Sequence, residues 1–208
     1  MNQQVFPTKG NLMAAKKSLD LSRLGYDLLD RKRNILVREL MLKVDDAKRL
    51  KAQIADTFEK AYKALEQANI TLGIIEGVAR GVPVDNSIEL GSHSVMGVDI
   101  PTVTIGEKDT KPDYGFSQTN SMLDYAYQCF HEAKLITARL AEVENSVYRL
   151  AFAIQKTQKR ANALKNIMIP QFTSTAKFIT EALEEKEREE FSRMKVIKKQ
   201  KESKEAER

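Results

Sequence analysis

The sequence of 208 residues contains no tryptophan, one cysteine, five prolines and nine glycines, and it has no long apolar run. The single cysteine, Cys129, cannot close a disulfide within the chain, and we interpret it as a small apolar side chain of a helix. A transmembrane helix needs about 18 consecutive apolar residues, which this sequence does not offer. The first residues also lack the basic start and the apolar core of a signal peptide. We therefore expect a cytoplasmic protein that does not itself insert into a membrane.

Motifs for catalysis and for cofactor or metal binding are missing as well. There is no glycine-rich phosphate loop, and the two histidines, His93 and His131, lie in different predicted elements. No Ser/His/Asp set can be placed convincingly, and carboxylates such as Glu142 and Glu144 are expected on an exposed helix face. The sequence therefore predicts a protein that is not an enzyme by itself and that holds neither a cofactor nor a metal ion.

Positive charge is present without the aromatic residues that nucleic-acid binders usually add. The formal net charge is +5, and Arg31, Lys32 and Arg33 form a basic cluster with Arg38. Acidic residues at positions 27, 30 and 39 dilute this cluster. We therefore expect no nucleic acid partner and interpret the cluster as a contact for acidic loops of a protein ring.

What the sequence does contain is one unbroken apolar stripe between Met122 and Met168, ahead of Pro170. Its positions are separated by four and three residues in turn, which is typical of a left-handed coiled coil. We identify these residues as central positions of the seam: Ile136, Leu140, Val143, Val147, Leu150, Ile154 and Leu164. An ordinary helical bundle is the alternative, but a helix of this length would be a rod of roughly 70 Å.

A second and less regular stripe runs through residues 9–75, which contain no proline. Thr8 is the expected N-cap of this helix, after an N-terminal lead of residues 1–8. Arg33 falls on a stripe position, and Gly25 costs the helix about 1 kcal/mol. At such positions either the contact face of the helix changes locally or a third component contacts the helix.

Residues 76–116 form a connector in which glycine, proline and β-branched residues are frequent. Brief strands of a β-hairpin are predicted at residues 87–90, 94–100 and 102–105. The residues considered as caps of the helix that follows are Ser117, Thr119 and Ser121. The connector is therefore expected to be a small domain between two long helices.

The second helix is expected to cover residues 117–208, with a charged C-terminal tail. Pro170 lies inside it, and because proline removes a backbone N–H and clashes with the preceding turn, we expect a kink or local unwinding there. The apolar positions after Pro170 are shifted by one residue relative to the stripe before it. Residues 181–208 carry nine acidic and nine basic side chains, which predicts either a solvated tail stabilised by ion pairs or a contact for a partner.

Together these segments predict a mainly α fold, a long antiparallel two-helix left-handed coiled coil with a small β-hairpin connector domain. If the helices fold back on each other, residues whose numbers sum to about 194 lie side by side along the coil. This rule places Gly25 beside Pro170. A two-stranded rod has little core per unit length, so its stability is expected to depend on partner proteins.

Three stretches of sequence carry a resemblance to a known family. The first combines Pro7-Thr8-Lys9 with Gly25-Tyr26-Asp27-Leu28-Leu29-Asp30-Arg31-Lys32-Arg33. The second is the connector motif Val95-Met96-Gly97-Val98-Asp99-Ile100-Pro101. The third and most specific joins Lys156-Thr157-Gln158-Lys159-Arg160-Ala161-Asn162-Ala163-Leu164, Ile169-Pro170 and Leu183-Glu184-Glu185-Lys186-Glu187-Arg188-Glu189. In order and spacing these stretches are similar to the D subunits of V-type and A-type rotary ATPases, with small departures at Lys159, Ala161 and Lys165.

The resemblance implies a central rotor shaft that couples ATP hydrolysis or synthesis to the translocation of protons or sodium ions. Its terminal end would enter the hexamer of catalytic A and B subunits, and its connector end would dock on the funnel-shaped adaptor of the membrane ring. The F subunit would bind the middle of the coil. The residues that we expect to contact the hexamer are Lys9, Lys16, Arg31, Arg33, Glu184, Glu185 and Arg188. A passive coiled-coil scaffold or tether without a motor role is the alternative.

Overall fold

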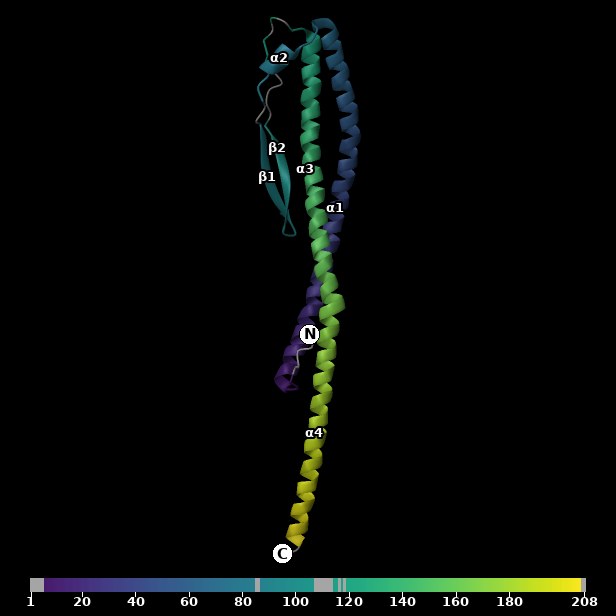
Figure 1. The fold of residues 1–208 in the computed structure, drawn as a ribbon, viewed down its shortest axis with the longest axis vertical. Helices are drawn as coiled ribbons and strands as arrows, with labels where there is room; N and C mark the ends of the chain where they lie inside the picture. The colour runs from purple at the N-terminus through teal and green to yellow at the C-terminus, as the bar shows by residue number, and fades with distance from the viewer. Residues whose placement is uncertain (1–5, 85–86, 107–113, 116, 118, 207–208) are drawn as a thin grey trace. The chain divides into compact units, whose positions relative to one another are not determined.

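The computed structural model describes residues 6–84, 87–106, 114, 115, 117 and 119–206, which fall into two compact units. The terminal unit comprises residues 1–32 and 156–208, and the central unit comprises residues 33–155. The elements are α1 (Lys9–Leu72), α2 (Glu76–Gly81), β1 (Ile88–Val95), β2 (Val98–Ile105), α3 (Ser121–Ala163), the π-helix η2 (Leu164–Met168) and α4 (Ile169–Ala206) (Figure 1). Parts of the expected N-terminal lead and of the connector lie outside the described residues.

Helix α1 begins and ends at residues that satisfy its free backbone groups. Thr8 Oγ1 accepts a hydrogen bond from the Asn11 N–H at 3.2 Å, so Thr8 is the N-cap, as predicted. The helix ends at Leu72, where Gly73 has a φ of 77° and donates its N–H to the Asn69 carbonyl at 2.9 Å. The first helix therefore ends three residues before the predicted boundary.

The start of α3 is capped by Asn120, which was not among the predicted caps. Asn120 Oδ1 accepts the Leu123 N–H at 3.1 Å, so the cap is this amide rather than one of the hydroxyl residues that we expected. The Asn120 side chain also donates from Nδ2 to Thr71 Oγ1 at 2.8 Å. A single side chain thus starts α3 and ties it to the end of α1.

The second long helix, in which a kink or local unwinding was predicted at Pro170, contains the π-helix η2. Its closing hydrogen bond runs from the Ile169 N–H to the Leu164 carbonyl, five residues back instead of four. Pro170 follows directly and has no N–H to donate. The loosening expected at Pro170 therefore takes the form of one extra residue in the turn before it. This extra residue explains why the apolar stripe shifts by one position there.

The connector contains α2 and a two-stranded antiparallel hairpin instead of three brief strands. Strands β1 and β2 pair from Ile88 opposite Ile105 to Val95 opposite Val98. Met96 and Gly97 form the two-residue turn with φ values of 51° and 73°, and two positive φ angles are the geometry of a type I′ turn. The Met96-Gly97 motif of the sequence is therefore the tip of the hairpin.

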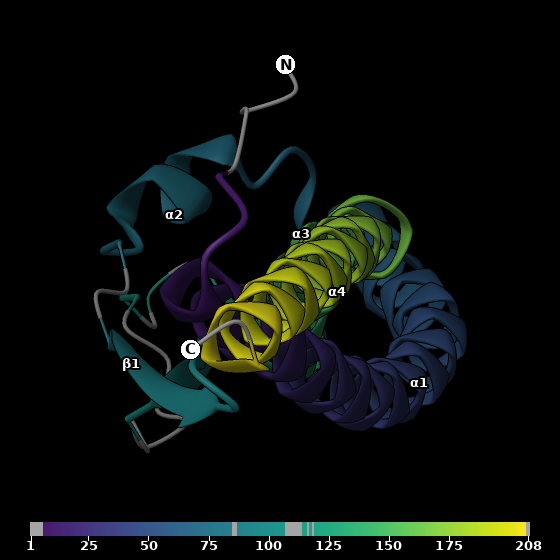
Figure 2. The same ribbon diagram turned by 90° about the horizontal axis from the view of Figure 1, so that it is seen from below.

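The hairpin lies beside α3, and β2 is the strand next to the helix (Figure 1). Seen along the helices, the hairpin and α2 lie on the same side of α3 (Figure 2). Two side chains of α3 bond the outer backbone edge of β2. The Glu142 carboxylate accepts the Val103 N–H at 3.0 Å, and the Arg149 guanidinium donates to the Asp99 carbonyl at 3.2 Å. Pro101 lies between Asp99 and Val103 on the same outward-facing edge, so its missing N–H costs no ladder hydrogen bond with β1.

The central unit packs α1 against α3 in antiparallel order. Lys51 pairs with Glu144 at 2.9 Å, and nearer the connector the rings of Tyr62 and Phe130 meet edge to face, with centroids 5.6 Å apart. The main apolar cluster joins three elements through Leu36, Ile100 and Leu150, which are all fully buried. The hairpin therefore shares its core with both long helices.

The terminal unit pairs the first part of α1 with the end of α3, η2 and α4. Ala15, Ala176 and Ile179 form its buried cluster, and Lys9 pairs with Glu187 at 3.3 Å. The residue beside Gly25 is Leu164, whose Cδ1 lies 3.6 Å from the position of an added Cβ, and not Pro170. The fixed sum of residue numbers fails here because two helices that wrap around each other need not advance equally.

The predicted fold class is confirmed: the protein is mainly α, with long helices paired in antiparallel order and a small β-hairpin. The apolar stripes and the breaker residues of the connector account for this result.

Candidate functional site

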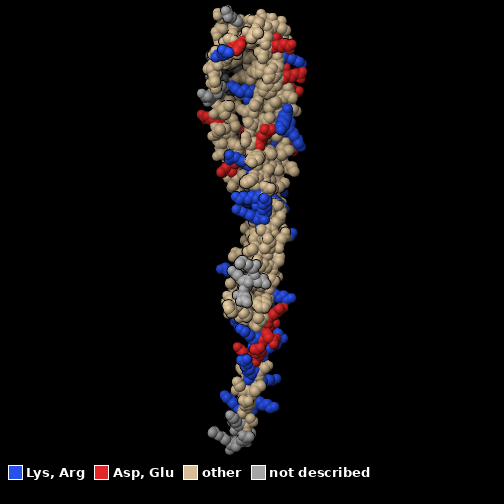
Figure 3. All heavy atoms as spheres, viewed as in Figure 1, with Lys and Arg blue, Asp and Glu red and all other residues tan. Residues whose placement is uncertain are grey.

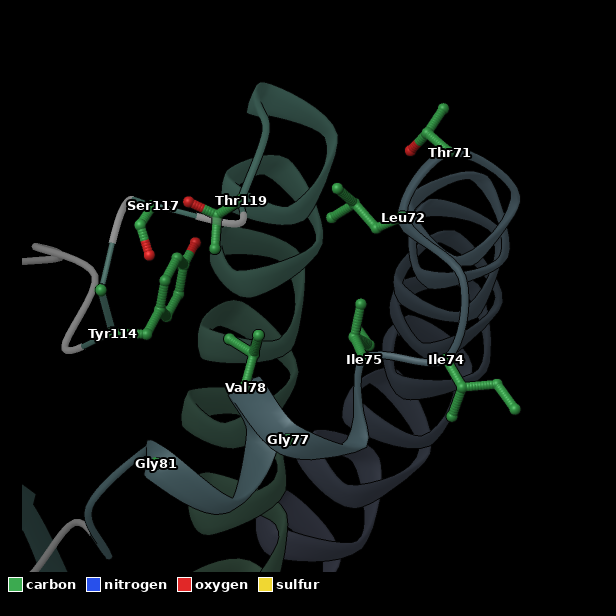
Figure 4. Close-up of a pocket in the computed structure, with 11 residues that line it drawn as sticks. Thr71, Leu72, Ile74, Ile75, Gly77, Val78, Gly81, Tyr114, Ser117 and Thr119 are labelled. Atoms are coloured by element: carbon green, nitrogen blue, oxygen red, sulfur yellow. The ribbon is translucent and has the colours of Figure 1, made fainter.

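An open cavity of about 920 Å³ lies where α1 passes into α2. Its walls come from the end of α1, from α2 and from Tyr114, Gly115, Ser117 and Thr119. The described lining side chains are apolar or carry a hydroxyl group. Figure 4 shows Leu72 and Val78 turned toward α3, while Ile74 points away into solvent. Such a surface offers apolar contact and a few hydrogen bonds, and these are the means by which a protein partner is bound.

Tyr114 forms one wall of this cavity. Burial, and then the hydrogen bond that its hydroxyl donates to Asp124 Oδ1 at 2.5 Å, raise the pKa of Tyr114 above its usual range. Its ring meets that of Tyr127 edge to face, with centroids 5.6 Å apart. Tyr114 is therefore a neutral, fixed part of the wall.

Large apolar side chains are exposed at the end of α1 and after α2. Ile74 is 92% exposed, and Ile70 and Val84 are also largely exposed. Single exposed apolar residues are ordinary on proteins, but three of them between positions 70 and 84, one of which lines the cavity, form an uncovered apolar surface. This surface was not predicted, although the lack of charged residues from position 70 to 75 was a usable signal.

A second uncovered surface is the far part of α4. Every side chain from Glu184 to Ser203 is exposed, including the apolar Phe191, Met194 and Ile197. Charge is unevenly distributed along it: residues 181–190 hold six acidic and two basic side chains, and residues 191–204 hold one acidic and six basic (Figure 3). This helix therefore presents an acidic segment followed by a basic one.

The predicted hexamer contacts form more than one group. Lys9 pairs with Glu187, while Arg188 pairs with Glu185 at 3.1 Å and lies one turn from Glu184. Arg31 and Arg33 are more than 20 residues further along α1 than Lys9, which is about 33 Å or more at 1.5 Å per residue. Lys16 and Arg31 are exposed, and the Arg33 guanidinium donates to Asn34 Oδ1 at 3.1 Å. The structure thus does not bring these residues into a single site.

The predicted seam residues all face inward to some degree. Val143 and Leu150 are buried, and the other five are half-buried. A further apolar row, Leu21, Leu24 and Leu28, is exposed on α1. It was missed because only one stripe per helix was sought, although its spacing of three and four residues places it on one face.

Neither a metal site nor a membrane span emerges from the described residues. They contain no group of three or more His, Cys, Asp and Glu side chains placed to hold a metal ion. In the same part of the chain, no helix combines the length and the apolar character needed to cross a membrane.

Comparison with known proteins decides the family. The sequence model of the family of ATP synthase D subunits matches residues 11–199. The chain belongs to this family. The D subunit of the V-type ATP synthase of Thermotoga neapolitana is 45% identical over 93% of this chain and 97% of its own length.

Archaeal relatives agree with this family. The D subunit of the A-type ATP synthase of Pyrococcus furiosus is 36% identical over 94% of both chains. That of Methanopyrus kandleri is 34% identical over 94% of this chain and 86% of its own. The resemblance read from the three sequence stretches is therefore confirmed, and it extends over nearly the whole chain.

Proposed function

We propose that this chain is the central rotor shaft of a V-type or A-type rotary ATPase. It transmits rotation between a hexamer of catalytic A and B subunits and a membrane ring that translocates ions. The names of its relatives, which are subunits of ATP synthases, support this role. Two long antiparallel helices, closed at one end by the bond between Asn120 and Thr71, are a suitable form for such an element.

The observation that carries this proposal is the exposed part of α4. Beyond the pair between Lys9 and Glu187, α4 continues as a helix whose side chains are exposed through Ser203. A helix that buries nothing is only marginally stable in water, so it needs a partner that covers it. We place this part inside the cavity of the A and B hexamer, with Glu184, Glu185 and Arg188 among its contacts.

The other uncovered surfaces suit the remaining partners. The exposed apolar residues at the end of α1 and after α2 would dock on the funnel-shaped adaptor of the membrane ring. The F subunit would cover the middle of the coil, where Tyr62, Tyr148 and Phe152 are all largely exposed. The chain would thus be peripheral to the membrane and cytoplasmic, held there by its partners.

In this role the chain makes no chemical change itself, and ATP is converted at the interfaces of the A and B subunits. A shaft that contacts the three interfaces unequally gives each of them a different contact free energy, and rotation moves this difference from one interface to the next. The irregular turn at η2 and Pro170 makes the two sides of the shaft unequal.

Reassembly with the catalytic hexamer tests the proposal. Purified chain is mixed with separately purified A and B hexamer, and complex size and ATP hydrolysis are measured. We expect a complex with one copy of this chain per hexamer and an altered rate of hydrolysis. Replacing Phe191 and Ile197 by serine should weaken assembly at least about tenfold, because the apolar side chains that the hexamer would bury are removed. Gln200→Ser is the matched control on the same exposed stretch.

A passive tether would give a different result. It would bind the hexamer without changing the rate of hydrolysis, or it would remain alone as a stable homodimer. Either outcome would contradict the rotor proposal and favour a passive scaffold.

A further inference from the structure

The π-helix η2 coincides with an irregularity in the apolar stripe of the terminal unit. From Thr157 the stripe runs through Ala161, Leu164 and Met168 with spacings of four, three and four. Phe172 then follows after four residues where three would keep the repeat. One residue in an α-helix turns the chain by about 100°, so without the extra residue of η2 the later stripe would face away from α1.

Packing is thin at this level on both helices. No residue from Arg23 to Lys32 in α1 is buried. On the partner helix none is buried from Asn162 to Thr175, a range that covers the end of α3, η2 and the start of α4. Buried residues lie on either side of this stretch. Thr157 and Ala161 are buried before it, in α3, and Ala176 and Ile179 are buried after it, in α4. The stretch around η2 is therefore a weakly packed stretch between two well-packed ones.

Gly25 weakens α1 at the same level. An added Cβ would lie 3.6 Å from Leu164 Cδ1, which is ordinary van der Waals contact, so space does not require glycine here. Glycine in a helix interior costs about 1 kcal/mol relative to alanine, because it leaves the unfolded backbone freer. The neighbouring contact between the helices is Lys165 Nζ over the Tyr26 ring, 5.7 Å from its centroid, which is adaptable.

Pro170 removes a further restraint from the same place. In an α-helix its N–H would bond the Asn166 carbonyl, and proline has no N–H to offer. A π-turn, a proline and an unburied stretch thus follow one another closely in the terminal unit, and Gly25 faces the first residue of the π-turn.

We propose that this level is a bending and twisting joint built into the coil. The joint comprises η2 and Pro170 together with Gly25 of α1. Because neither helix has a buried residue there, α4 turns relative to α3 at this joint while the packed parts on either side move as stiff bodies. The joint is a property of this chain, and it stands whether or not the chain acts as a rotor.

Hydrogen exchange of the unmodified full chain tests the joint directly. Amides from Leu164 to Gln171 should exchange at least about tenfold faster than those of residues 150–160 and of residues 176–183, because local opening costs less there. Equal protection across the three stretches would overturn the proposal.

A regularised variant provides the second test. Deletion of Gln171 together with Pro170→Ala brings Met168 and Phe172 to a spacing of three and restores an uninterrupted repeat. Spin labels on cysteines placed at the exposed Lys156 and Lys177, in a Cys129→Ser background, report the distance across the joint. About 30 Å separates the two positions along a helix.

In the natural sequence the distribution of this distance should be about twice as wide as in the regularised variant, because a continuous helix bends less. Equal widths would contradict the joint. Circular dichroism checks that the variant remains helical. If it does not fold, Gly25→Ala replaces it, since the added methyl fits, and it should narrow the distribution in part. If the distance distribution of Gly25→Ala is not narrower than that of the natural chain, α1 does not contribute to the joint. The exchange experiment then decides whether η2 and Pro170 form it.

Discussion

Leu150 shows how much of the central unit depends on one side chain. It is fully buried and packs with Leu36 of α1 and Ile100 of β2, so it joins both long helices and the hairpin. A fully buried leucine contributes a few kcal/mol of apolar burial, which is a large share of the stability of a small unit.

Leu150→Asp should therefore destabilise the central unit by about 4 kcal/mol or more, because it adds an unpaired buried charge to the loss of packing. Thermal unfolding followed by circular dichroism measures the effect. Ala151→Asp, at the neighbouring exposed position, is the control and should change the midpoint little. Equal midpoints for the two variants would contradict the position of Leu150 in the core.

Tyr114 predicts a dependence of stability on pH. Burial and its hydrogen bond to Asp124 raise the pKa of Tyr114 in the folded chain above the unfolded value of about 10. The neutral hydroxyl is thus favoured by folding, and its contribution is complete below about pH 10 and decreases as the pH rises further.

Tyr114→Phe should unfold more easily than the natural chain at pH 7, by about 1 kcal/mol for the lost hydrogen bond. This difference should shrink above about pH 10, as ionisation of Tyr114 begins to destabilise the natural chain. Urea unfolding at several pH values measures both effects. A difference that stays constant up to about pH 11 would show that the raised pKa of Tyr114 does not contribute.

At the scale of the element, the hairpin is defined by its turn and by its register. The Gly106 N–H donates to the Ser87 carbonyl at 3.1 Å, so alternate residues of β1 from Ser87 onward bond to β2. The N–H of His93 therefore points into the ladder, and that of Ser92 points to the outer edge. This edge of β1 is the one that α3 does not cover.

Proline substitution tests this register. Ser92→Pro removes an outward N–H and should leave the hairpin largely intact, whereas His93→Pro removes a ladder bond and should disrupt it. Hydrogen exchange of the Thr102 and Ile100 amides reports the difference. Similar loss of protection in both variants would show that the register is shifted by one residue.

At the scale of the whole molecule, the uncovered surfaces are more informative than the cores. They are the surface around the cavity at the end of α1, the exposed aromatic residues of the middle and the far part of α4. A chain with apolar residues exposed in all these places is expected to be stable chiefly within a complex.

Removal of residues 188–208 tests whether this part of α4 contributes to the stability of the chain or to its assembly with the hexamer. These residues follow the Lys9–Glu187 pair, and those described through Ser203 are exposed. The midpoint of thermal unfolding should therefore change by less than about 3 °C. Co-purification with the A and B hexamer should be lost. A large drop in the midpoint would show that this part of α4 packs within the chain.

Most of the fold could be predicted from the sequence because its signals are local. The repeat of four and three residues from Met122 to Met168 reports a buried face directly, and Thr8 marks the start of α1. The β-branched residues of the connector likewise predicted a hairpin. The two long strands were not predicted, since Met96 at a positive φ is rare and the turn was read as part of a strand.

The sequence by itself determined which faces are apolar, where the helices are broken and to which family the chain is similar. Only the tertiary structure decided that Asn120 starts α3 and bonds to α1, that Glu142 and Arg149 hold the hairpin, and that Leu164 lies beside Gly25. It also decided that the one-residue shift is absorbed as a π-helix. The physical reason is that periodicity depends on neighbours in the chain, whereas these contacts depend on groups distant in sequence.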